Sequence, residues 1–185
     1  MKELSLNILD VAKNSVRAGA SRIVISLNTD DAGILTLRIV DNGCGIEKDI
    51  LEHVTDPFYT TRTTRKVGLG LPLLKMAAEQ TGGSVTIASS TEKGNSGTTL
   101  QATFDTTNID CMPMGDIVST VCILIAGSPD IDFEFYDVSP ERSVSLKTSE
   151  LREILGDISL AEPEIQGWIS EYLKEQYSTI DKNKN

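Results

Sequence analysis

Three short segments between residues 41 and 71 carry the residue types that a nucleotide-binding pocket needs. The first is an acidic turn with two glycines, Asp41-Asn42-Gly43-Cys44-Gly45-Ile46, and the second is a threonine- and arginine-rich loop over residues 56–62. The third is a glycine-rich helix start, Gly68-Leu69-Gly70-Leu71. In such a pocket a carboxylate holds the base, glycine backbone allows its close approach, and a helix N-terminus binds the phosphates.

The acidic turn follows a segment whose pattern predicts a β-strand. Aliphatic side chains alternate over residues 35–39, and continuing the alternation places Asp41 on the same inward face. An inward carboxylate needs a hydrogen-bond donor because an unpaired buried charge is costly, and the amino group of adenine is one such donor. Gly43 and Gly45 would let the backbone run close under a flat ring, because glycine has no Cβ and tolerates positive φ.

The glycine-rich segment opens a predicted helix over residues 69–80. Gly82-Gly83 follows the last apolar positions and ends the helix, while Pro72 falls in its first turn, where a missing N–H is harmless. The free N–H groups of residues 68–71 and the positive end of the helix dipole form an anion site.

The loop before this helix is basic in an acidic chain. Residues 60–66 contain no acid, although the formal net charge of the whole chain is −10. Arg62, Arg65 and Lys66 therefore suit a polyphosphate beside the helix start, and Phe58 would pack the hinge of the loop. The alternative for each basic side chain is a solvated loop charge, and the sequence leaves both interpretations open.

The N-terminal segment predicts a helix over residues 2–17, because apolar side chains recur there at helical spacing. A second, polar stripe recurs at steps of four, three and four residues, which places its members on one face. Its members are Glu3, Asn7, Asp10 and Asn14. A solvated helix face is the alternative, but the short side chains after Glu3 suit it less well than lysine or glutamate would.

Taken together, these segments resemble the GHKL ATPase superfamily of gyrase, heat-shock chaperones, histidine kinases and MutL. The similarity covers about residues 3–104 and rests on four boxes in the right order and spacing. The first glycine box, the kinase-type F box, the second glycine box and the third are matched by Asp41-x-Gly43-x-Gly45, Asp56-Pro57-Phe58-Tyr59-Thr60-Thr61, Gly68-Leu69-Gly70-Leu71 and Gly97-Thr98. The resemblance implies an α+β fold, a two-layer α/β sandwich that binds ATP and Mg²⁺, with a short lid like that of the kinases.

The resemblance also implies roles for individual residues. Asn14 takes the position of the magnesium-binding asparagine, and an amide oxygen is a hard ligand that suits Mg²⁺. Thr98 takes the position of the threonine that helps hold Asp41 and a water beside adenine. The nucleotide-binding positions are Asn14, Asp41, Gly43, Gly45, Ile46, Phe58, Thr61, Arg62, Arg65, Lys66, Gly68, Leu69, Gly70, Leu71 and Thr98.

Two positions depart from the family pattern. Asp10 stands where hydrolysing members carry glutamate and histidine kinases carry asparagine, so it is the candidate catalytic base. Aspartate is one methylene shorter than glutamate, which leaves the rate of any hydrolysis open. Lys66-Val67 replaces the Gly-Thr usual before the second glycine box, which would stiffen the lid and add a cation.

Length and composition predict a single globular domain with a small appendage. The chain has 185 residues, 39% of them hydrophobic and 24% charged. We expect an ATP-binding domain over residues 1–106 and a regulatory or partner-binding region over residues 107–185. The charge of −10 argues against nucleic acid as the main partner. Free cysteines, no signal-peptide pattern and no apolar run long enough to span a bilayer predict a cytoplasmic protein.

The C-terminal region predicts further helices and one hairpin. Four strands are expected before residue 105, at residues 23–27, 35–41, 85–88 and 98–104. After them we expect a helix over residues 116–126, hairpin strands over 131–138 and 143–147, helices over 151–155 and 164–177, and a polar tail over 181–185. We hypothesise that the hairpin extends the sheet or covers its edge, because an open edge invites aggregation.

Two functions remain open at this stage. The first is a protein kinase of signal transduction, which transfers the γ-phosphate of ATP to a partner protein in trans. Transfer in trans is expected because no phosphoacceptor hairpin is expected here and the single histidine, His53, is interpreted as a structural or surface residue. The alternative is a nucleotide-gated binding switch with slow hydrolysis and no transfer. A DNA-associated ATPase of MutL type is disfavoured by the short lid and the acidic charge, and a homodimer stays open.

Overall fold

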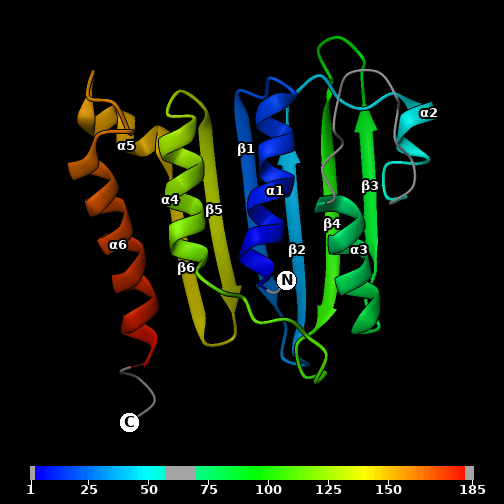
Figure 1. Cartoon of the computed structure of the whole chain (residues 1–185). Coiled ribbons are helices and arrows are strands. Elements are labelled where there is room, and N and C mark those ends of the chain that lie inside the picture. The colour runs from blue at the N-terminus through cyan, green and yellow to red at the C-terminus, as the bar shows by residue number, and fades with distance from the viewer. Residues whose placement is uncertain (1–2, 57–69, 182–185) are drawn as a thin grey trace.

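A six-stranded sheet and one layer of helices make up the computed structural model of the protein, which describes residues 3–56 and 70–181. The elements in chain order are α1 (Leu4–Arg17), β1 (Arg22–Thr29), β2 (Ile34–Asp41), α2 (Lys48–Leu51), α3 (Gly70–Gln80), β3 (Val85–Ser90), β4 (Gly97–Asp105), α4 (Ile117–Gly127), β5 (Asp132–Ser139), β6 (Arg142–Lys147), α5 (Thr148–Leu155) and α6 (Pro163–Asp181). The strand order is β3-β4-β2-β1-β5-β6, and α1, α3, α4 and α6 lie on one face of the sheet (Figure 1). The predicted two-layer α+β class is therefore confirmed.

The strands alternate as the sequence predicts. On β2 the residues Leu35, Leu37 and Ile39 are buried beneath the helices, whereas Arg38 is exposed on the uncovered face. The β1–β2 hairpin closes on Asp30, whose Oδ1 accepts the N–H groups of Ala32 and Ile34 at 2.9 Å each. No helix in the described part of the chain is long and apolar enough to span a bilayer.

The C-terminal hairpin extends the sheet, which confirms one of the two positions expected for it. Strand β5 pairs in parallel with β1, with Val24 opposite Glu134, and β6 pairs antiparallel with β5. A single hydrophobic core runs under the whole helical layer and includes Ile8 on α1, Phe104 on β4 and Phe135 on β5. The division into units at residues 106 and 107 stays a prediction.

Helix α6 protects the free edge of β6. The Gln176 side-chain oxygen accepts the backbone N–H of Ser145 at 2.9 Å, and its nitrogen donates to the Ser145 carbonyl at 3.0 Å. The amide thus pairs with the edge as a neighbouring strand would, which leaves less of the edge open to another chain.

A buried carboxylate holds the end of α6 in place through a hydrogen bond. Asp137 on β5 is only 2% exposed, and it accepts hydrogen bonds from Tyr177 Oη at 2.7 Å and from Arg142 Nη2 at 2.9 Å. Burial and the adjacent Asp137 carboxylate raise the pKa of Tyr177 well above its ordinary value. Tyr177 therefore stays protonated and donates to Asp137 throughout the physiological pH range.

The segment before α4 completes the N-terminus of α1. Helix α1 has no side-chain cap, but Leu4 N–H donates to the Pro113 carbonyl at 2.9 Å and Ser5 N–H to the Met114 carbonyl at 2.8 Å. Asn7 is buried and donates to Met112 Sδ at 3.4 Å. Asn7 therefore contacts this linker, so the polar stripe expected on α1 is buried at Asn7 and exposed at Asp10.

Two further details concern the exposed side of α3 and the length of α2. Leu73 on α3 is apolar, but it is 46% exposed. Helical spacing gives the reason, because Leu71, Leu74 and Ala78 already fill the inward positions and Leu73 is turned away from them. The short helix α2, which follows the acidic turn, is limited to Lys48–Leu51.

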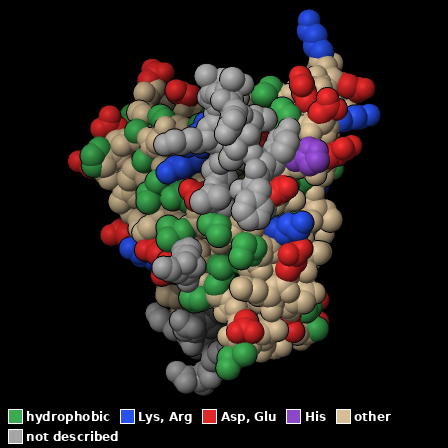
Figure 2. All heavy atoms as spheres, turned by 45° about the vertical axis from the view of Figure 1, so that its right-hand side comes forward, with side chains coloured by type: hydrophobic (Ala, Val, Ile, Leu, Met, Phe, Trp, Pro, Cys, Tyr) green, Lys and Arg blue, Asp and Glu red, His purple; other side chains and the backbone are tan. Residues whose placement is uncertain are grey.

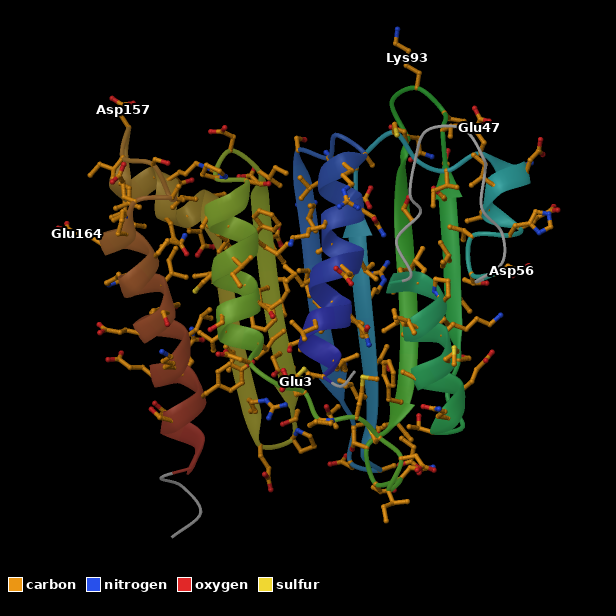
Figure 3. The ribbon with its side chains drawn as sticks, in the orientation of Figure 1. Glu3, Glu47, Asp56, Lys93, Asp157 and Glu164 are labelled. Carbon is orange, nitrogen blue, oxygen red and sulfur yellow. The ribbon has the colours of Figure 1, made fainter. Side chains whose placement is uncertain are left out.

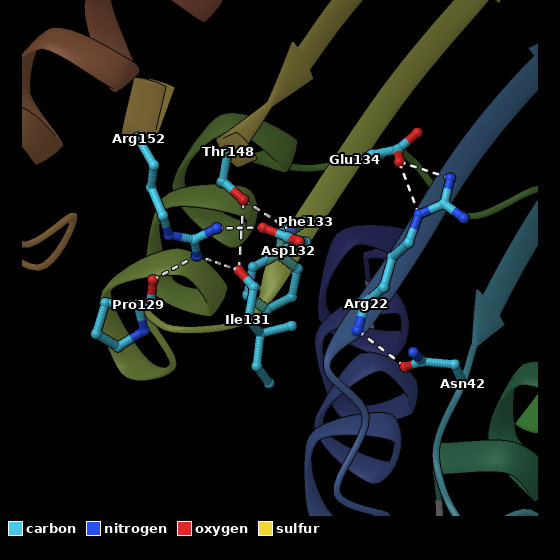
Figure 4. Close-up of polar contacts among 9 residues, drawn as sticks. All are labelled: Arg22, Asn42, Pro129, Ile131, Asp132, Phe133, Glu134, Thr148 and Arg152. Atoms are coloured by element: carbon cyan, nitrogen blue, oxygen red, sulfur yellow. Dashed lines mark hydrogen bonds and ion pairs between the residues drawn. The ribbon is translucent and has the colours of Figure 1, made fainter. Parts of the chain in front are cut away.

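Two side chains of α5, Thr148 and Arg152, hold this helix against the beginning of β5 (Figure 4). Thr148 is fully buried, and its hydroxyl accepts the Phe133 N–H at 2.8 Å and contacts the Ile131 carbonyl at 3.3 Å. Arg152 donates to the Pro129 carbonyl at 2.6 Å and to the Ile131 carbonyl at 2.7 Å, and it pairs with Asp132. On the uncovered face of the sheet, Arg22 pairs with Glu134 at 2.6 Å and links β1 to β5.

Thr148→Val is predicted to destabilise the protein by about 1–3 kcal/mol, because the buried Phe133 N–H loses the hydroxyl that accepts its hydrogen bond. Urea denaturation measures the loss, and amide hydrogen exchange at Phe133 should become faster. Thr148→Ser is the control, since it keeps the hydroxyl and loses one methyl group. Equal exchange at Phe133 in the two variants would show that the hydroxyl does not protect this amide.

Candidate functional site

A cavity of about 100 Å³ lies where α1, the end of β2 and the start of α3 meet the β3–β4 hairpin. Its apolar wall includes Val11, Ile39 and Ile87, while Asn14 and Asp41 bring polar groups to it. The lining residues are Val11, Asn14, Ser15, Ala18, Ile39, Asp41, Gly45, Ile46, Leu71, Ile87, Thr98 and Leu100. An apolar slot with a carboxylate in its wall suits a flat heterocycle that carries an amino group.

The Asp41 carboxylate is held from two sides. Ser15 Oγ donates to Asp41 Oδ2 at 2.5 Å, and the Gly43 N–H donates to Asp41 Oδ1 at 2.9 Å. An inward carboxylate was expected to need a hydrogen-bond donor, and here the protein itself supplies two donors. Each carboxylate oxygen has a second lone pair, so Asp41 can still accept a bond from a ligand.

Ser15 is a site residue that the sequence reasoning missed. It is buried on α1 beside Asn14, and a signal was present, because Ser15 follows Val11 by four residues on the apolar face of a helix. A serine at a buried helical position requires a partner for its hydroxyl, and that partner is Asp41.

Ser89 is the second residue that was missed. Its Oγ accepts the Ile46 N–H at 2.8 Å, donates to the Gly97 carbonyl at 2.9 Å and lies 2.8 Å from Thr98 Oγ1. Thr98 lies directly opposite Asp41 in the β2–β4 ladder. Ser89 therefore fastens the acidic turn to the β3–β4 hairpin, a contact that no spacing along the chain could indicate.

Gly45 has a backbone conformation that disfavours other residues, and it lies where a side chain would clash. Its φ is +74°, and a Cβ at this position would lie 1.9 Å from the Ser90 carbonyl oxygen. The turn after β2 thus passes directly against β3, whereas the expected close approach of this backbone to a flat ring stays a prediction.

Asn14 and Asp10 occupy different surroundings on α1. Asn14 is half-buried at the cavity, where Arg17 Nη1 lies 3.4 Å from its side-chain oxygen. Asp10 is exposed and lies beside the first residue of α3, since a Cβ on Gly70 would lie 3.0 Å from the Asp10 Cβ. The candidate base is therefore next to the helix N-terminus that was expected to bind phosphate.

The Asn14 side chain fits a magnesium ion that has few protein ligands, which is the arrangement expected from the sequence. Residues 3–56 and 70–181 contain no cluster of three or more acidic, histidine or cysteine side chains able to hold a metal. Mg²⁺ commonly keeps waters and phosphate oxygens and takes one or two protein ligands. The Asn14 amide oxygen at the cavity suits that arrangement.

The structure brings most of the described predicted residues together. Asn14, Asp41, Gly45, Ile46, Leu71 and Thr98 line the cavity, with Gly43 and Gly70 next to them in the chain. The remaining predicted positions lie outside the described residues, namely Phe58, Thr61, Arg62, Arg65, Lys66, Gly68 and Leu69. His53 does not line the cavity and is exposed among acidic side chains (Figure 2).

Comparison with known proteins identifies a family. The profile of the histidine kinase-, DNA gyrase B-, and HSP90-like ATPases matches residues 2–108, which is more than half of the chain. The DNA mismatch repair protein MutL of Lactococcus lactis subsp. lactis is 29% identical over 174 residues, 85% of this chain and 24% of that protein. Sporulation kinase D of Bacillus subtilis is 36% identical over 89 residues, 47% of this chain and 17% of that protein. The chain thus spans a quarter or less of the length of these relatives.

A solved structure supports the same architecture. The Aquifex aeolicus MutL ATPase domain complexed with ADP superposes with a TM-score of 0.52 at 15% identity, over 84% of this chain and 68% of that chain. At this identity the similarity shows the fold alone.

Gly45→Ala is predicted to cost about 3–5 kcal/mol of stability, because a left-handed alanine and a clash with the Ser90 carbonyl add together. Gly94→Ala is the matched control. Its φ is +88° with no atom within 4 Å of the added Cβ, so it should cost only about 1–2 kcal/mol. Thermal melting followed by circular dichroism compares the two, and equal losses would argue against a tight contact at Ser90.

Proposed function

The chain belongs to the histidine kinase-, DNA gyrase B-, and HSP90-like ATPase family, and we propose that it binds Mg·ATP and transfers the γ-phosphate to a partner protein. One observation carries the binding half of this proposal. Six residues that the sequence singled out for a nucleotide converge on one cavity from four separate elements: Asn14, Asp41, Gly45, Ile46, Leu71 and Thr98.

The base is recognised at the Asp41 end of the cavity. Asp41 accepts a hydrogen bond from the adenine amino group, and Ser15 and Gly43 keep the carboxylate oriented for it. The apolar side chains of Ile39 and Ile87 contact the faces of the ring. Because both protein donors are already in place before a ligand binds, little reorganisation is required.

The phosphates extend toward the start of α3. The N–H groups near Gly70 and the positive end of the helix dipole stabilise their charge, with Arg62, Arg65 and Lys66 proposed as further contacts. Asn14 supplies the protein ligand for Mg²⁺, which when bound would offset charge on the phosphates.

Asp10 acts as the base for the group that receives the phosphate. Its exposed carboxylate lies beside the α3 N-terminus, where the γ-phosphate would be directed. Phosphoryl transfer depends mainly on positioning and charge stabilisation, so a short carboxylate is sufficient to assist a partner's hydroxyl or imidazole.

Similarity to a sporulation kinase over 89 residues supports the kinase interpretation. The alternative is a nucleotide-gated switch with slow hydrolysis and no transfer, which the exposure and short reach of Asp10 favour. A DNA-linked role like that of MutL is less compatible with the acidic surface, since residues 107–185 carry six basic and fifteen acidic side chains.

Asp41→Asn is predicted to weaken Mg·ATP binding about 100-fold, because the new amide N–H₂ faces the adenine amino group and leaves a donor unpaired. Isothermal titration calorimetry measures the affinity. Ser15→Ala should cost less, about fivefold, since Gly43 still orients the carboxylate. Asp31→Asn, in the exposed β1–β2 turn, is the control of equal charge change. Unchanged affinity in Asp41→Asn would contradict the assignment of the cavity.

Phosphotransfer is tested with γ-labelled ATP and Mg²⁺, with and without extract from the source cell. We expect label on a second protein, lost in Asn14→Ala and kept in Asn28→Ala, an exposed asparagine on β1. Acid stability of the bond separates serine from histidine acceptors, and His53→Ala checks for labelling of the chain itself. Retained ATP or slow phosphate release without labelled protein would exclude the kinase and leave the switch.

A further inference from the structure

Nearly all of the net charge of the chain lies in its C-terminal part. Residues 107–185 contain six basic and fifteen acidic side chains, a formal charge of −9, whereas residues 1–106 contain eleven basic and twelve acidic ones. Nucleotide binding does not require this excess of acid, because a phosphate site is favoured by positive charge. The acidic excess therefore needs a separate explanation.

Helix α6 carries an exposed aromatic pair within this acidic part. Trp168 is 49% exposed and Tyr172 is 38% exposed, and their rings stack with centroids 5.1 Å apart and planes inclined by 10°. The packing of α6 onto the core comes from the fully buried Ile169 and Leu173. The aromatic pair thus adds apolar surface to a helix that is already anchored, which is typical of a contact surface.

Acidic side chains border this pair. Helical spacing places Glu164 four residues before Trp168, and Glu171 and Glu175 three residues after Trp168 and Tyr172. All three are exposed, and none forms an ion pair with a described residue. Figure 3 shows Glu164 projecting away from the sheet on α6 and Asp157 at the α5–α6 turn above it. Trp168, Tyr172, Glu164, Glu171 and Glu175 are called the α6 face below.

The exposed aromatic rings and the acidic rim of the α6 face indicate the kind of partner that can bind there. We propose that it is a docking surface for a lysine- or arginine-rich amphipathic segment of another protein, whose apolar side chains cover the aromatic pair and whose cations meet the acidic rim. Nucleic acids and anionic membranes present phosphates, which the same carboxylates repel. A second copy docked through this face would set the acidic rims against each other, because a two-fold interface brings together identical patches.

The α6 face lies away from the nucleotide cavity. The order of the elements, which Figure 1 shows, places β6 and α6 at one end of the sheet and β4 and β3 toward the other. The cavity beside Asp41 is lined by Ile87 on β3 and Leu100 on β4. A segment bound on α6 leaves the nucleotide cavity open. Docking also requires no nucleotide, so its test is independent of the ATP site.

The test uses the full chain and a synthetic amphipathic peptide of leucine and lysine at helical spacing. Trp168 is the only tryptophan, so its fluorescence reports contact with the α6 face directly. We expect saturable binding that weakens with salt. The variant with Glu164→Gln, Glu171→Gln and Glu175→Gln should bind about tenfold more weakly, since three rim ion pairs are lost.

A matched variant separates the local surface from overall charge. Glu47→Gln, Glu52→Gln and Glu92→Gln remove three exposed acids outside the C-terminal region and should leave peptide binding unchanged. Tyr172→Ser should also weaken binding, and thermal melting verifies that each variant is folded. Equal loss in the two triple variants, or no binding by the native chain, overturns the proposal. So does a Trp168 response to anionic phospholipid vesicles, or a dimer in sedimentation velocity that dissociates in the α6 variant.

Discussion

The Asp41 carboxylate, held at the end of β2 by Ser15 and Gly43, is the interaction on which the rest of the site depends. A carboxylate removed from water must be paired, and its partners must come from fixed backbone and a fixed helix. The position of Ser15 on α1 and the turn at Gly43 meet this requirement, while the β2–β4 register sets Thr98 opposite Asp41. The same arrangement leaves acceptor capacity for a ligand.

The C-terminal part of the chain is built into this framework. The carbonyls of Pro113 and Met114 complete the N-terminus of α1, and β5 pairs with β1 directly beneath that helix. Since α1 carries Asp10 and Asn14, the residues after the family-type domain support the helix that positions the candidate chemistry. Helix α4 contacts both α1 and α6 and connects the two in the helical layer.

The family sets the nucleotide chemistry, and the individual features of this chain decide how it is used. The proposed steps after nucleotide binding involve Asp10, which stands where the resemblance implies glutamate or asparagine, together with the acidic C-terminal part and the aromatic pair on α6. A partner held on α6 and a phosphate directed past Asp10 are compatible in one molecule, because the two sites lie over different strands of the sheet.

The sequence by itself determined the local elements and the identity of the chemical groups. Alternation gave the inward position of Asp41, helical spacing gave α1 and α6, and glycine chemistry gave the close turn at Gly45, because each depends on neighbours within a few residues. Only the tertiary structure decided which groups meet. In it Ser15 bonds to Asp41, and Ser89 bonds to both the turn and the hairpin. Asn7 is buried against the linker, and Leu73 is exposed. Such contacts join residues far apart in the chain, and their partners are fixed by the packing of whole elements, which no local pattern encodes.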